Sequence, residues 1–168
     1  MIEPYTDPKF YDKKIAEINV DLTALGWIET VYPLTQIGVD EEGTFPEVYR
    51  NDGTKKSQRV YPHGNSISFF ALNDTLTRID ESDMYTVNFG LIVWADLTKV
   101  NTDKDYNYTT ELINDVRRVI DSNDGYDYSI ELQGVFSDYD QLEKVENQNT
   151  MLPNTAFKIN FTCDLLTC

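Results

Sequence analysis

The sequence predicts an α+β fold in which a mixed, mainly antiparallel sheet has helices packed on one face and carries a long β-hairpin arm. Three observations lead to this prediction. Residues 8–25 and 109–121 place apolar side chains at helical spacing. Residues 85–96 and 156–165 alternate apolar and polar side chains, as strands do. Residues 43–64 place a turn signal between two β-prone runs.

Length and charge limit what the chain can be. Its 168 residues fit one domain, and no internal repeat or low-complexity linker divides them. Acidic residues number 29 against 14 basic ones, which gives a net charge of −15. Such a surface repels phosphate backbones and anionic lipids, so we expect no specific nucleic-acid binding and no membrane binding. The charge is also compatible with solubility alone.

The first expected helix covers residues 8–25. Asp7 would be its N-cap and Pro8 its first helical residue. Its apolar stripe consists of Tyr11, Ile15, Ile18, Leu22 and Leu25. Gly26 would end the helix, since glycine accepts the backbone conformation found after a helix C-terminus.

The next two segments predict an irregular strand and the hairpin arm. Residues 27–39 are β-prone but contain Pro33, which is typical of an irregular or edge strand. The arm, residues 43–64, turns at Asn51-Asp52-Gly53. It joins apolar positions to the most basic stretch of an acidic chain, so we expect it to reach a neighbouring subunit. The candidate interface residues are Phe45, Val48, Tyr49, Lys55, Lys56, Arg59 and Tyr61. The alternative is a hairpin folded back on its own sheet.

The remaining elements are mostly strands. Residues 66–72 predict one strand, and residues 73–83 a polar connection. Residues 85–96 carry apolar side chains on both faces near their C-terminal half, which indicates a central strand. Thr109 would cap the helix over 109–121.

The C-terminal third predicts two further strands and a short helix. Tyr128, Ile130 and Leu132 alternate as a strand. The polar segment 137–153 leaves room for a short helix capped by Ser137. Residues 156–165 predict a half-buried strand whose polar positions face solvent.

No motif for catalysis, cofactor binding or metal binding stands out. The single histidine, His63, has no accompanying cysteine or second histidine for zinc, and no Gly-x-Ser-x-Gly elbow. Phosphate-binding glycine loops are missing. The acidic cluster 121–127 fails as an EF-hand loop, because the first ligand position falls on Ile120. We therefore expect no enzyme, no cofactor and no metal; carboxylates paired in space for glycoside hydrolysis stay an open alternative.

Cysteines and the chain start give two further expectations. Cys163 and Cys168 make no disulfide framework, so we expect both thiols to be reduced. Residues 1–4 contain neither a basic region nor an apolar run, so we expect no signal peptide, and no stretch reaches transmembrane length.

The order of elements resembles that of tail-terminator and neck-ring proteins of tailed bacteriophages. The resemblance rests on three stretches: Tyr85-Thr86-Val87-Asn88-Phe89-Gly90-Leu91-Ile92-Val93-Trp94, Glu111-Leu112-Ile113-Asn114-Asp115-Val116-Arg117 and Phe157-Lys158-Ile159-Asn160-Phe161-Thr162-Cys163. It covers residues 84–168 by pattern and the first half by element order alone. In that family a helix-backed mixed sheet assembles into a ring between head and tail.

This resemblance implies a structural virion protein. The chain would form a ring homo-oligomer in the neck or tail, contact neighbouring neck or tail proteins, and let DNA pass through a bore without binding it. An acidic lumen would suit that passage, because it does not hold phosphates. The alternatives are a tail-tube or baseplate adaptor, a monomeric ligand-binding module with a tyrosine-rich surface, and last a hydrolase.

Overall fold

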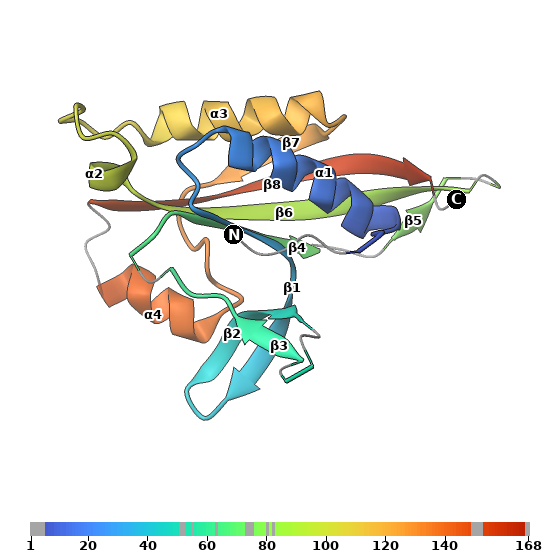
Figure 1. The fold of residues 1–168 in the computed structure, drawn as a ribbon, viewed down its shortest axis with the longest axis horizontal. Helices are drawn as coiled ribbons and strands as arrows, with labels where there is room; N and C mark the ends of the chain where they lie inside the picture. Colours follow the sequence, from blue (N-terminus) through green and yellow to red (C-terminus); the bar gives the residue numbers. More distant parts are fainter. Residues whose placement is uncertain are drawn as a thin grey trace.

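Two long antiparallel strands, β6 (Met84–Asp96) and β8 (Asn154–Leu166), form the centre of the sheet (Figure 1). They belong to a computed structural model that describes residues 6–50, 53–54, 56–62, 64–72, 76–79, 81, 83–148 and 153–166. Their pairing runs without interruption from Met84↔Leu166 to Asp96↔Asn154. His63, Lys55, Cys168, residues 1–4 and the first two residues of the predicted hairpin turn lie outside the described part.

The strand order across the described sheet is β3-β2-β1-β4-β6-β8-β7, and β5 pairs with β6 beside it. The other strands are β1 (Thr30–Asp40), β2 (Gly43–Tyr49), β3 (Ser57–Arg59), β4 (Ile67–Leu72), β5 (Thr77–Arg78) and β7 (Tyr126–Glu131). The helices are α1 (Phe10–Ala24), α2 (Leu97–Val100), α3 (Thr109–Ser122) and α4 (Asp140–Gln148). Only β1 and β4 pair in parallel among the described strands, so the predicted α+β fold with a mixed, mainly antiparallel sheet is confirmed.

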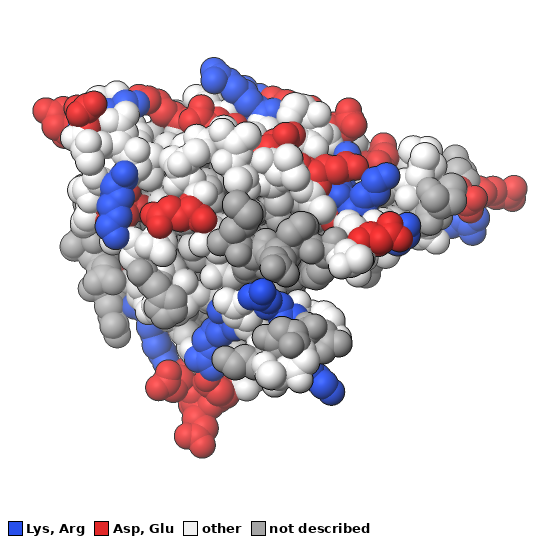
Figure 2. All heavy atoms as spheres, in the orientation of Figure 1, with Lys and Arg blue, Asp and Glu red and all other residues white. Residues whose placement is uncertain are grey.

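One face of the sheet, here called the hairpin face, is partly covered by α4 and by β2 and β3. Its buried cluster includes Val48, Val60, Phe69, Trp94 and Phe136. The prediction placed helices on one face only, and α4 departs from it by covering this second face (Figure 1). Lys and Arg side chains gather around β2 and β3, whereas Asp and Glu side chains are prominent along α3 and at the β1–β2 turn (Figure 2).

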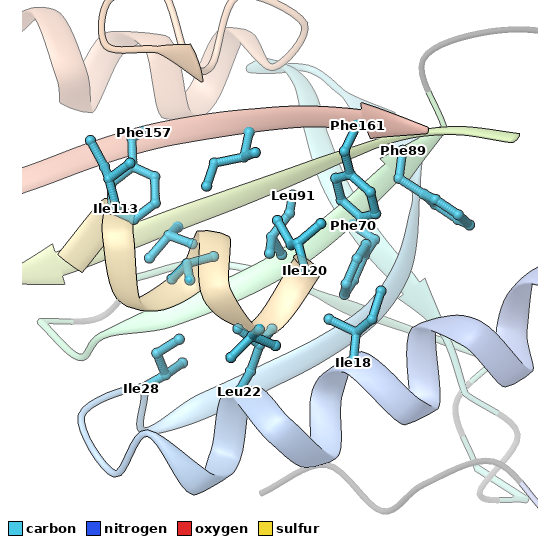
Figure 3. Packing of buried hydrophobic residues seen from close by; sticks show 14 of the residues in the cluster. Ile18, Leu22, Ile28, Phe70, Phe89, Leu91, Ile113, Ile120, Phe157 and Phe161 are labelled. Atoms are coloured by element: carbon cyan, nitrogen blue, oxygen red, sulfur yellow. The ribbon is translucent and has the colours of Figure 1, made fainter. Parts of the chain in front are cut away.

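The opposite face, here called the helix face, is covered by α1 and α3 as the two apolar stripes predict. Ile18 and Leu22 of α1 and Ile120 of α3 point toward Phe89 and Phe161 on the central strands (Figure 3). A strand pair with helices on one side and α4 or a hairpin on the other is buried on both faces. β8 is buried at most positions on both of its faces, so the expectation of a half-buried strand is wrong.

The helix starts differ from the predicted caps. α1 begins at Phe10 with Lys9 at the N-cap position, and the Asp7 carboxylate accepts a hydrogen bond from Lys9 Nζ instead of from the helix backbone. In α3, Thr109 is the first helical residue and does not cap it; its hydroxyl donates to Asn107 Oδ1 at 2.6 Å. α4 begins at Asp140, so Ser137 lies too far upstream to cap it. Gly26 does follow the end of α1 as expected, with a φ of +78°.

β1 connects two parts of the sheet. Its first half pairs in parallel with β4 and its second half pairs antiparallel with β2. The register shifts between Val31 and Leu34, on either side of Pro33, because proline has no N–H for the ladder. The predicted irregularity is confirmed, but β1 is not an edge strand.

None of the helices in the described part combines the length and the apolar character that crossing a membrane requires.

Candidate functional site

The hairpin arm lies against its own sheet. β2 pairs with β1 from Thr35↔Val48 to Asp40↔Gly43 and with β3 on its other side. Val48 is fully buried in the cluster on the hairpin face, beside Phe69 and Trp94 of the central sheet. The apolar side chains that suggested a subunit interface thus complete the protein's own core. The prediction that the arm stands away from its domain is wrong.

Phe45 and Arg59 hold the hairpin in this place. Phe45 is buried, and the Arg59 guanidinium lies over its ring at 3.7 Å from the centroid. Arg59 also pairs with Asp40 and donates to Gln141 Oε1 of α4 at 3.0 Å. The Glu42 backbone N–H and the Arg59 guanidinium beside Asp40 hold the pKa of that carboxyl below its ordinary value. Phe45 and Val48 are therefore core residues and not interface residues, whereas Arg59 anchors the hairpin with a side chain that is 44% exposed and stays a candidate interface residue.

The other predicted interface residues differ in how far they are exposed to solvent. Tyr49 is 55% exposed and Lys56 is also exposed, so both remain available to a partner. Tyr61 is half-buried and packs against the cluster on the hairpin face. Lys55 lies outside the described residues. Ile37 and Val39 in the outer half of β1 are exposed large apolar side chains that the sequence argument did not single out.

A groove of about 610 Å³ lies on the part of the hairpin face that the hairpin and α4 leave uncovered. Residues of β1, β4, β6, β8 and β7 line it, so it crosses five neighbouring strands. Side chains two apart on a strand share a face, and Lys158, Asn160 and Thr162 share the face of buried Ala156. The floor of the groove is therefore polar, beside an apolar cluster on the same face of the sheet.

Hydrogen bonds order the floor of the groove. The Thr162 hydroxyl donates to Asn88 Oδ1 at 2.8 Å across the β6–β8 pair. Asn160 Nδ2 donates to Glu131 Oε1 at 2.7 Å and to Ser129 Oγ at 3.2 Å across the β7–β8 pair. These pairs fix the amide and carboxylate groups before any ligand arrives, so the floor is preorganised.

Lys158 is the unusual residue of this floor. It is only 9% exposed, and it faces Glu131 in the register of β7 and β8. Its backbone is paired in the sheet, but its ammonium forms no salt bridge and no hydrogen bond with another residue in the described part of the chain. Its neighbour Glu131 is instead held by Asn160. The sequence placed Lys158 at a polar alternating position of the last strand, and a lysine within a central strand was the signal that could have marked it.

The groove is bordered by three carboxylates and an aromatic wall. Asp127 and Glu131 come from β7, and Asp138 precedes α4. Tyr139 closes one side: it is buried, its ring meets Phe69 edge-on at 5.9 Å, and burial raises the pKa of its phenol. The arrangement offers one cation, several hydrogen-bonding groups and an acidic border. It suits recognition of a polar chain better than covalent chemistry.

Comparison of the chain with protein-family models, with curated proteins and with solved structures found no match. Within the described residues, no group of three or more His, Cys, Asp or Glu side chains is placed to hold a metal ion. Cys163 is buried with a free thiol, and burial raises the pKa of that thiol to about 11.

Proposed function

We propose that this chain is a structural subunit that forms a ring in the neck or tail of a tailed bacteriophage, joining portal-side and tail-side proteins. The support is the order of elements, a mixed sheet with α1 and α3 on one face, together with two exposed apolar surfaces described next. The alternative within the same class is a tail-tube or baseplate adaptor.

The observation that carries the proposal is that the two ends of the strand order carry different exposed apolar side chains. The hairpin surface consists of Ile37 and Val39 on β1, whereas the exposed Tyr49 of β2 lies on the opposite face of the β1–β2 pair. The edge surface consists of Ile130 on β7 and Leu132 beside it, whereas the exposed Tyr126 is opposite Thr162 and lies on the other face of the sheet. β7 pairs only with β8 among the described strands, so its outer edge presents unpaired backbone groups. Two different surfaces that meet head to tail generate a closed ring when the rotation between copies closes.

Charge supports the same reading. A net charge of −15 on each copy would be repeated around a bore, where it would keep DNA from adhering. Basic side chains around β2 and β3 lie away from the acidic ones along α3 (Figure 2). Opposite charges on separate parts of one subunit favour correct docking of neighbouring copies over random contact.

The test separates a head-to-tail ring from a monomer and from a two-fold dimer. The mass of the purified protein is measured in solution for the wild type, for Ile37→Asp in the hairpin surface, and for Ile130→Asp in the edge surface. We expect a large oligomer for the wild type and monomers for each variant. Mixing the two variants should give dimers and nothing larger, because each pair has one intact junction and cannot extend.

Val20→Asp is the matched control, since Val20 is an exposed apolar residue of α1 outside both surfaces. This variant should assemble as the wild type does. A wild-type monomer at assembly concentrations would refute the ring. A mixture in which one variant dimerises with itself would refute head-to-tail assembly. Co-purification of the wild type with portal or tail-tube proteins, and its loss in both surface variants, tests the place in the virion.

A further inference from the structure

The groove on the hairpin face contains a charge that the fold leaves without a partner. Lys158 is buried at the floor, and within the described residues its ammonium forms no ion pair or hydrogen bond. The ammonium nitrogen keeps some contact with solvent in the groove, and an incoming carboxylate would replace that water with a charge-assisted hydrogen bond. Lys158 is therefore positioned to receive an anionic group from outside the chain.

The border of the groove restricts which anions can reach Lys158. Asp127, Glu131 and Asp138 line it, so a free anion is repelled before it arrives. A nucleic acid is disfavoured for the same reason and by the net charge of −15. A ligand that carries one carboxylate together with cationic groups satisfies both the lysine and the border.

The dimensions of the groove suit an extended polypeptide. It crosses five neighbouring strands, a span of roughly 19 Å at about 4.8 Å between strands. An extended chain advances about 3.3 Å per residue, so about six residues would cross it. The Asn88 amide on the floor is of the kind that pairs with peptide groups.

We propose that this groove binds an extended segment of a partner protein, with one Asp or Glu carboxylate on Lys158 and Lys or Arg side chains beside Asp127, Glu131 and Asp138. The paired floor holds the peptide groups in place, and the ammonium fixes the register of the segment. The proposal holds whether or not the chain forms a ring, because the four charged residues that it uses lie outside the hairpin and edge surfaces, although Ile37 of the hairpin surface also lines the groove.

The test uses the full-length protein and a displayed library of random nine-residue peptides. Peptides are selected on the wild type and counter-selected on Lys158→Met, which keeps the aliphatic stem and removes the charge. We expect the retained peptides to share one acidic residue flanked by basic ones. Synthetic copies should bind Lys158→Met about tenfold to a hundredfold more weakly than the wild type, as the loss of a charge-assisted hydrogen bond predicts.

Two further variants make the result specific. Lys13→Met removes an exposed lysine of α1 and should bind the peptides as the wild type does. Asp138→Asn removes one charge from an exposed border residue, keeps the backbone oxygen that accepts from Thr44, and should weaken binding of peptides with flanking basic residues. A peptide whose acidic residue is replaced by Gln or Asn should bind the wild type as weakly as the original binds Lys158→Met.

Three outcomes would overturn the proposal. The first is a selection with no shared acidic position. The second is equal binding to the wild type and to a folded Lys158→Met. The third is a shared pattern that matches a segment of this chain and competes with its self-association, which would make a second copy the occupant. If Lys158→Met does not fold, binding by Asp138→Asn and binding of the peptide whose acidic residue is replaced still test the proposal.

Discussion

Phe89 on β6 is the most informative residue for testing the core on the helix face. It is fully buried, stacks on Phe161 with ring centroids 5.5 Å apart, and meets Phe70 edge-on at 6.2 Å (Figure 3). Phe89→Ala removes a whole ring from between two strands and two helices. The loss of buried area and the cavity left behind should lower the free energy of unfolding by about 3–5 kcal/mol. Since stability of a natural protein is about 5–15 kcal/mol, this is a large share.

Urea unfolding followed by tryptophan fluorescence measures this change. The midpoint should fall and the slope should stay the same, since the surface exposed on unfolding is nearly unchanged. Phe89→Leu should lie between the wild type and Phe89→Ala, because it leaves a smaller cavity. Val20→Ala, at an exposed position of α1, should change stability by less than about 0.5 kcal/mol. A loss below about 1 kcal/mol for Phe89→Ala would refute the placement of this face as core.

Three further predictions concern other parts of the fold. Gly125→Ala should destabilise by roughly 1–3 kcal/mol in the same unfolding assay, because its Cβ would lie 2.3 Å from Ile120 Cγ2; an unchanged midpoint would contradict this contact. With Cys168 replaced by Ser, Cys163 should react slowly with a maleimide at pH 8 until urea unfolds the chain, since it is buried and its pKa is about 11; fast labelling of the folded protein would contradict its burial. Hydrogen bonds from Thr44 lower the pKa of the Asp140 carboxyl, so this group stabilises the fold above the ordinary carboxyl pKa and stops doing so as the pH falls through the lowered pKa. Asp140→Ala should therefore lose less stability than the wild type when the pH is lowered through this range. An equal loss of stability in the two proteins would argue against the Asp140–Thr44 contact.

The sequence predicted the long elements well because their patterns report local geometry. The stripes of α1 and α3 need only the helical repeat, and the length of β6 and β8 needs only the alternation of strands. Helix starts were predicted less well. Asp7 and Thr109 are good capping residues, yet each is engaged elsewhere, by Lys9 Nζ in one case and by Asn107 in the other. Which local partner a short polar side chain chooses depends on the entering backbone, and a residue pattern does not contain that information.

The groove could not be predicted because it depends on which strand lies beside which. Alternation alone places Lys158 and Asn160 on a solvent-facing side of the last strand. That strand becomes buried on both faces only because it lies between β6 and β7 with further structure on each side. Pairing of β7 with β8 then brings Glu131 opposite Lys158, across 27 residues of sequence. Such juxtapositions follow from long-range topology, and no single segment of the chain encodes them.

The hairpin shows how one set of residues can mislead an argument from composition. Apolar residues beside a basic run suggested an arm that seeks a neighbour, and the structure uses the same residues to cover Trp94 and Phe69 on its own sheet. Removing the hairpin would expose that cluster. If such a deletion abolished assembly, the cause could be either a damaged core or a lost interface. Exposed positions of the same element do not have this ambiguity. Ile37 and Tyr49 can be changed without opening the cluster. Substitutions at these two positions, and not at Val48, are therefore the ones that test assembly.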